Sequence, residues 1–151
     1  MTEDQKYAAA VDAGEFPANI GVPLDDSFKD ARGVITNLLL TPITSVAEIT
    51  SRKGTVRANH VHKTDWHYAY VCTGKVLYFE REVGGKEIPE PQKFGPGQMF
   101  FTPPNREHAM LFAEDTTIFT FAKNVRTHDN HEADLVRVEF ITPEIAASYV
   151  K

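Results

Sequence analysis

Short runs of β-branched and aromatic residues, many of them alternating with polar positions, dominate the chain from about residue 34 onward. Such runs are typical of strands. They lie at residues 34–40, 43–50, 55–62, 66–72, 75–83, 98–103, 108–113, 116–123 and 134–141. Turn-forming glycine, proline and asparagine separate many of them. Roughly nine strands without intervening helices predict an all-β sandwich or barrel.

Helices are expected only at the two ends of the chain. Thr2 and Gln5 match a capping box, and Gly14 follows as a stop signal. Thr142 and Pro143 are a helix cap followed by proline at the first helical position. Both predicted helices are short, so each must pack against the barrel to be stable.

One domain accounts for the whole chain. Residues 1–33 are expected to form the N-terminal helix and a strap, with residues 15–33 irregular because they are rich in proline, glycine and aspartate. Residues 34–141 would form the β-barrel, and residues 142–151 the closing helix. Several strands are apolar on both faces, which requires a covering segment or a partner subunit.

Composition narrows the class of protein. The chain has 151 residues, of which 42% are hydrophobic and 25% charged, with a formal net charge of −5; this is the profile of a soluble domain. No stripe of lysine and arginine suits nucleic acid, and no apolar run approaches the roughly 20 residues of a membrane span. The polar, acidic N-terminus is unlike a signal peptide, and the single cysteine, Cys72, excludes an internal disulfide. These features predict a cytoplasmic protein that contacts neither nucleic acid nor membrane.

The stretch RANHVHKTDWH at residues 57–67 holds three of the six histidines. On a strand, His60 and His62 project from one face about 6–7 Å apart, close enough to bind one metal ion at about 2.0–2.1 Å per bond. The alternative is a pair of solvated polar residues. Strict alternation places the more polar residues on the opposite face, which argues against a purely solvated pair; these residues are Thr55, Arg57 and Asn59.

The wider spacing resembles the two consensus motifs of the cupin superfamily. Five residues separate Gly54 from His60, one separates His60 from His62, four precede His67, and six precede Gly74. A second set runs Gly97, five residues, Pro103, one residue, Asn105, two residues, His108. The resemblance is to small RmlC-like cupins and implies a double-stranded β-helix, or jelly roll, with short terminal helices.

The resemblance also implies a metal site. Carried over position by position, the ligands would be His60, His62, His67 and His108, although His67 stands where the family has glutamate. Two further departures are Asn105 in place of glycine and Phe112 in place of asparagine. Four imidazoles favour one divalent transition metal (Zn, Fe, Ni or Cu) over Mg or Ca. Their lack of charge would favour an anionic, oxygenated small-molecule substrate. His67 is alternatively a second-shell residue or a catalytic base.

Other polar residues are weaker candidates for residues of the site. His128 and His131 fall in RTHDNHEAD, which is expected to be a solvated loop between two strands. Arg57 and Lys63 flank the histidines, where they would either meet an anion at the mouth of the site or remain solvated.

Apolar neighbours of the histidines suggest which way each face points. Met110 and Phe112 share the face of His108 and would form an apolar floor beneath the metal. Trp66, Tyr68 and Tyr70 alternate out of phase with His67 and should face away from it, into a second sheet or a dimer interface. A homodimer is therefore expected.

Three functions remain open. The residues around the two motifs, although they include no further diagnostic motif, resemble those of cupins of sugar-nucleotide and capsule pathways. These cupins include relatives of dTDP-4-dehydrorhamnose 3,5-epimerase, keto-sugar isomerases and the cupin domain of a capsule reductase. That similarity implies epimerase- or isomerase-type proton transfer by a small metalloenzyme. A mononuclear non-haem iron dioxygenase is the second reading. The third is a non-catalytic module that binds a small ligand or a metal.

Overall fold

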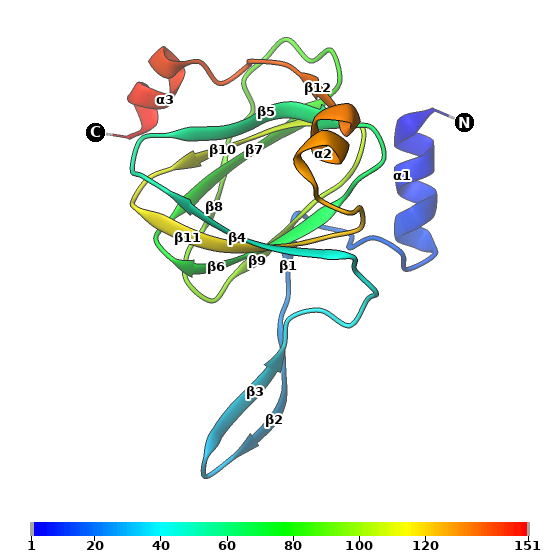
Figure 1. The fold of residues 1–151 in the computed structure, drawn as a ribbon, viewed down its shortest axis with the longest axis vertical. Helices are drawn as coiled ribbons and strands as arrows, with labels where there is room; N and C mark the ends of the chain where they lie inside the picture. The colour runs from blue at the N-terminus through cyan, green and yellow to red at the C-terminus, as the bar shows by residue number, and fades with distance from the viewer. Residues whose placement is uncertain (1, 151) are drawn as a thin grey trace.

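The computed structural model describes residues 2–150, which fold into two antiparallel five-stranded sheets that face one another (Figure 1). One sheet has the order β1-β9-β6-β11-β4, made of Gly21–Val22, Met99–Thr102, His67–Thr73, Thr116–Ala122 and Ser45–Ser51. The other has the order β12-β5-β10-β7-β8, made of Leu135–Arg137, Val56–His62, Arg106–Phe112, Val76–Glu82 and Gln92–Phe94. Each predicted run overlaps one of these strands or β3 (Gly33–Asn37), so the all-β prediction is confirmed.

Both faces of the sheet that contains β10 are buried. Met110 and Phe112 belong to the cluster between the two sheets, together with Ala69, Val71, Val76, Tyr78, Phe94, Phe100 and Ile118. Ala109 and Leu111 point the other way and pack beneath helix α3 (Pro143–Tyr149) with Phe140, Ile141 and Ala146. The predicted two-sided burial is therefore satisfied by a covering segment of the same chain.

The outer face of the other sheet is covered by the N-terminal segment. Helix α1 (Glu3–Asp12) begins at the predicted capping box, and Tyr7 and Phe16 pack against Trp66, Tyr68 and Phe101. The aromatic run at 66, 68 and 70 thus faces away from the barrel interior, as expected, but residues of the same chain cover it. The homodimer stays a prediction.

The segment at residues 15–33 is not irregular throughout. Its second half forms β2 (Asp25–Asp30), which pairs with β3 in a hairpin that projects away from the barrel (Figure 1). Asp30 accepts hydrogen bonds from the backbone and side chain of Arg32 and so stabilises the turn. Phe28, Val34 and Ile35 remain exposed on this hairpin. The β-branched residues of β3 pair with β2 here, which overrides the loop-like composition of the segment.

A bulge in β5 changes which residues share the face of the histidines. Ala58 and Asn59 have positive φ, and the pairing with β10 shifts from His108↔His60 to Met110↔Arg57. His108 and Met110 lie on one face of β10, so their partners His60 and Arg57 also share a face. The strict alternation assumed from sequence, which put Arg57 on the opposite face, is wrong.

The stretch that contains His128 and His131 is a helix and not a loop. Helix α2 (His128–Asp134) begins after Thr127, whose side chain accepts from the backbone N–H of Asn130. The predicted strand at 134–141 is correspondingly shortened to β12. In the part of the chain that the structure describes, no helix is long and apolar enough to cross a membrane.

Gly74, at the turn between β6 and β7, gives a test of the barrel's packing. Its φ is +92°, and an added Cβ would lie 2.5 Å from the carbonyl oxygen of Asp115 and 2.6 Å from Thr116 Cα. We expect Gly74→Ala to lower the free energy of unfolding by about 3 kcal/mol or more, because strain and overlap add. The matched control is Gly84→Ala, at a φ of +81° with open space around it, which should cost about 1 kcal/mol. Urea unfolding measures both, and equal losses would contradict the packing argument.

Candidate metal centre

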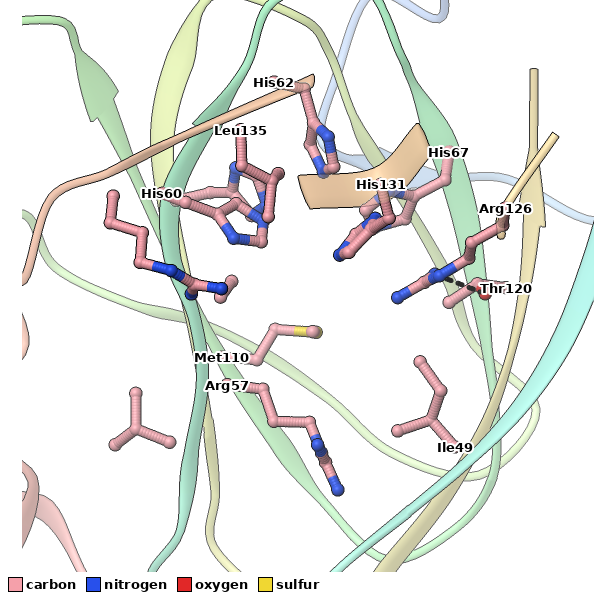
Figure 2. A pocket seen from close by; sticks show the side chains of 14 residues that line it. Ile49, Arg57, His60, His62, His67, Met110, Thr120, Arg126, His131 and Leu135 are labelled. Atoms are coloured by element: carbon pink, nitrogen blue, oxygen red, sulfur yellow. Dashed lines mark hydrogen bonds between the residues drawn. The ribbon is translucent and has the colours of Figure 1, made fainter. Parts of the chain in front are cut away.

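The four histidines predicted from sequence meet at one end of the barrel interior (Figure 2). His60 and His62 come from β5, His67 from the start of β6, and His108 from β10. The ring centroid of His60 lies 4.7 Å from that of His62 and 4.6 Å from that of His108, and those of His62 and His67 are 5.5 Å apart. Strands from both sheets therefore contribute to a single cluster.

Each of these four side chains has a buried nitrogen without a hydrogen-bond partner among the residues described. The atoms are His60 Nδ1, His62 Nε2, His67 Nε2 and His108 Nε2. A buried polar atom normally has a partner, because leaving it unsatisfied costs about 1–3 kcal/mol. Four such atoms together fit the donor set of a metal ion.

The cluster divides into a compact trio and a more distant fourth member. The ligand nitrogens of His60, His62 and His108 all lie within 4.8 Å of one another. His67 falls outside that group, and its ring centroid is 6.1 Å from that of His108. The trio fits one ion directly. Ligation by His67, the residue at the glutamate position, remains a prediction.

Two contacts orient two rings of the trio, those of His62 and His108. His62 Nδ1 lies 3.2 Å from Asp134 Oδ2, and His108 Nδ1 lies 3.5 Å from the carbonyl oxygen of Arg106. Both partners are acceptors, which assigns the proton of each ring to Nδ1 and leaves Nε2 free to bind a metal.

Asp134 is held firmly in this position. It accepts from the backbone N–H and the hydroxyl of Thr64 and from the backbone N–H of Asp65. Burial disfavours its charged form, but these hydrogen bonds and the one from His62 outweigh burial and lower the pKa of Asp134. A charged carboxylate thus lies directly behind one of the candidate ligands. This carboxylate would offset part of the positive charge of a divalent ion bound by the neutral histidines.

Burial keeps the imidazoles neutral. Burial, together with the nearby His62 and His131, lowers the pKa of His60 to about 3. The pKa values of His67 and His108 are also lowered, first by burial and then by the neighbouring histidines. Neutral imidazole is the form that binds metals, so a cation near pH 7 need not displace protons. An all-nitrogen donor set favours a transition metal over Mg or Ca.

The histidines line a cavity of about 390 Å³ that also contains three arginines. Arg57, Arg126 and Arg137 lie around it, and among the described residues that line it there is no carboxylate. Met110 lines the cavity as expected, whereas Phe112 lies deeper in the core. Arg57 is a lining residue, but Lys63 is not.

The sequence prediction missed several residues of this cavity. His131, assigned to a solvated loop, lies on α2 with its ring centroid 5.8 Å from that of His62. Thr120, Arg126 and Arg137 also line the cavity. Alternation along β11 could have indicated Thr120, which is fully buried. The others are brought in by α2 and its flanking segments, for which the sequence carries no comparable signal.

The departures from the cupin consensus are explained locally. Asn105, at a glycine position, has a φ of 61°, a conformation that asparagine tolerates better than most residues. Gly54, Gly74 and Gly97, the motif glycines, have positive φ values of 85°, 92° and 83°. Phe112, at the asparagine position, is fully buried in the core between the sheets.

Comparison with known proteins identifies the fold. No protein-family model and no curated protein matches the sequence. Among solved structures, a QdtA 3,4-ketoisomerase from Thermoanaerobacterium thermosaccharolyticum, in complex with TDP, is 20% identical with a TM-score of 0.59, over 87% of this chain and 95% of that one. CapF, a capsular polysaccharide assembling protein of Staphylococcus aureus, is 22% identical with a TM-score of 0.56, over 83% of this chain and 37% of that one. A dTDP-4-dehydrorhamnose 3,5-epimerase from Sulfolobus tokodaii is 18% identical with a TM-score of 0.55, over 82% and 75%.

The metal-binding prediction can be tested by removing ligands. We expect the double variant His60→Ala/His62→Ala to contain no stoichiometric metal after purification, because it loses two of the three clustered nitrogens. His67→Glu should still bind metal through the trio, and an altered preference among Zn, Fe, Ni and Cu would show that residue 67 also coordinates the ion, because a carboxylate is a harder ligand. Elemental analysis measures both. A double variant that is still fully loaded with metal would contradict the assignment of His60 and His62 as metal ligands.

The contact between Asp134 and His62 gives a second test. We expect Asp134→Ala to weaken zinc affinity by about 10- to 100-fold, because His62 loses the partner that orients it. Thr64→Val is the matched control, since it deletes a hydrogen bond to Asp134 and leaves the His62 contact in place. Competition with a chromophoric chelator measures affinity, and thermal melts of the zinc-free proteins separate it from stability. Equal losses of affinity in the two variants would contradict the role of Asp134.

Proposed function

We propose that this cupin-fold chain is a small metalloenzyme that binds one divalent transition metal and catalyses isomerase- or epimerase-type proton transfer on a small anionic, oxygenated substrate. One observation carries the proposal. Four buried imidazole nitrogens without protein partners meet in a cavity that is lined by three arginines and by no carboxylate of the described chain. The first feature favours a cation, and the second favours an anionic ligand beside it.

The residues of the cavity have different roles in the proposed reaction. His60, His62 and His108 would hold the metal, and Asp134 would orient His62. A bound divalent cation would supply Lewis acidity toward a carbonyl or enolate oxygen. His67 lies outside the compact trio, and we assign it the transfer of a proton at Nε2. His131, on α2, is the alternative proton carrier.

The comparisons support this class of chemistry. Solved structures of the same fold include 3,4-ketoisomerases and a 3,5-epimerase, one of them in complex with TDP-4-keto-6-deoxyglucose. Isomerisation and epimerisation next to a keto group both require a proton to be removed and returned. Their sequence identities to this chain are below 25%, so the reaction class is a proposal drawn from the site.

A mononuclear iron dioxygenase is the second candidate. It is favoured by the compact group of three histidine nitrogens, because a three-histidine set leaves coordination positions open for a substrate and O₂. A binding module without catalysis is the third. Metal identity and oxygen consumption separate the dioxygenase from the isomerase, because iron with substrate-dependent oxygen uptake supports the dioxygenase.

Exchange of substrate protons with solvent tests the proposal directly. In D₂O, we expect the metal-loaded protein to introduce deuterium beside the keto group of a keto-sugar nucleotide or of a small keto acid, as followed by NMR. His67→Gln should retain metal and lose exchange by about 10²- to 10⁴-fold, the contribution typical of a general acid or base.

The matched variant is His131→Gln. Loss of exchange in His131→Gln alone would move the proton-transfer role to α2. Absence of exchange with both substrate classes in a metal-loaded wild-type protein would remove the isomerase and favour the binding module.

A further inference from the structure

Two arginines face the cavity without an ionic partner in the described chain. Arg57, on β5, donates from Nε to Ser51 Oγ at 2.7 Å and from Nη2 to the carbonyl oxygen of Thr50 at 3.0 Å. Arg126, between β11 and α2, donates from Nη1 to Thr120 Oγ1 at 3.3 Å. All three acceptors are neutral, so these contacts fix the positions of the guanidinium groups without cancelling their charge.

The third arginine of the cavity differs from these two. Arg137 Nη2 lies 2.7 Å from Glu132 Oε1 in an exposed ion pair. Its charge is therefore already balanced. Arg57 and Arg126 are the cations that remain available to a ligand.

The two guanidinium groups lie differently with respect to the histidines. Figure 2 shows Met110 between the histidines and Arg57, with Ile49 beyond it, whereas Arg126 lies beside His67 and His131. The cavity thus has histidines at one end, Arg57 at the other, and apolar side chains and Arg126 along its wall. Such an arrangement suits a ligand with oxygen groups at both ends and a carbon chain between them.

The electrostatic environment of Arg126 favours an anion. Its side chain is half-buried, and burial together with the charge of Arg57 lowers its pKa, against the opposing charge of Asp65. Two like charges that face one cavity repel each other, and an anion between them removes that repulsion. Carboxylate and phosphate groups match the planar guanidinium group, which can bind either through two hydrogen bonds.

We propose that Arg57 and Arg126 form an anion subsite that binds the carboxylate or phosphate of a small two-ended oxyacid, whose keto or hydroxyl end reaches the histidines. The subsite deepens the proposed function by naming its substrate class, and it rests on that function only for the metal end. No phenylalanine, tyrosine or tryptophan lines the cavity among the described residues. A nucleotide base would therefore lack the aromatic stacking surface that such bases commonly use.

A matched pair of ligands tests the subsite. 2-Oxoglutarate and 2-oxovalerate share the same 2-oxo acid end and chain length, but only the first has a distal carboxylate. We expect the zinc-loaded full chain to bind 2-oxoglutarate about 10- to 100-fold more tightly in calorimetry, because hydrogen bonds between charged groups are strong. Dihydroxyacetone phosphate, tested in parallel, shows whether phosphate or carboxylate is the preferred anion.

Substitutions test which residues cause the preference for 2-oxoglutarate over 2-oxovalerate. Arg126→Gln and Arg57→Gln should each remove most of the preference for 2-oxoglutarate and leave 2-oxovalerate binding and zinc content unchanged. Arg137→Gln controls for an arginine of the same cavity that is already paired, and Arg32→Gln on the hairpin controls for net charge. Arg126→Lys retains the charge and should retain part of the preference, which keeps the test valid if Arg126→Gln fails to fold.

The outcomes separate the subsite from the proposed function. Equal binding of the two oxo acids by wild type, with dihydroxyacetone phosphate binding no more tightly than 2-oxovalerate, would overturn the subsite, as would equal losses in Arg126→Gln and Arg32→Gln. The calorimetry measures binding and not turnover. A preserved preference for 2-oxoglutarate without proton exchange would support the subsite and contradict the isomerase.

Discussion

The pairing of β5 with β10, interrupted by the bulge at Ala58 and Asn59, is the constraint on which the site depends. It places His60 opposite His108 and turns Arg57 onto the same face. The bulge is held from outside the barrel, because the Asn59 side chain donates to the carbonyl oxygen of Ile141 and accepts from its N–H. Ile141 in turn packs in the core beneath α3. Ile141 therefore stabilises the bulge that positions the histidines, although it does not line the cavity itself.

His67 stands where the cupin motif has glutamate, and the nearby negative charge lies behind the histidine cluster instead, on Asp134. Asp134 lies behind His62 and remains ionised because Thr64 and Asp65 donate to it. A carboxylate in that position raises the basicity of the imidazole and holds its orientation. It does not line the cavity, which has no carboxylate among the described residues that surround it. In the proposed function, an anionic ligand would meet arginines and a bound cation, with no carboxylate of the cavity to repel it.

The local signals in the sequence were sufficient for nine of the strands and for the proximity of the four histidines, but not for β1, β2 and β8. Strand alternation depends on neighbours along the chain, and the cupin spacing places glycines where the turns need positive φ. The exposed hairpin, the bulge and helix α2 were not predicted. Asn59 needs Ile141, which lies 82 residues away, to define its conformation, and a parity argument confined to one strand cannot include that contact. The assignment of Arg57 to the wrong face follows directly from this omission.

Helix α2 shows why the arginines of the cavity were harder to predict than the histidine cluster. Its sequence, HDNHEAD, lacks the apolar periodicity that marks a packed helix. It is held instead by polar contacts: the Asp134 carboxylate accepts from Thr64, and the Asp134 carbonyl accepts from the N–H of Lys63. These contacts bring His131 close to His62, and Arg126, which precedes the helix, lines the same cavity as Arg57. A metal site built on strands follows from period-two spacing, whereas a ligand site closed by a polar helix depends on contacts between distant segments. The arginines of the proposed anion subsite belong partly to this second kind of structure.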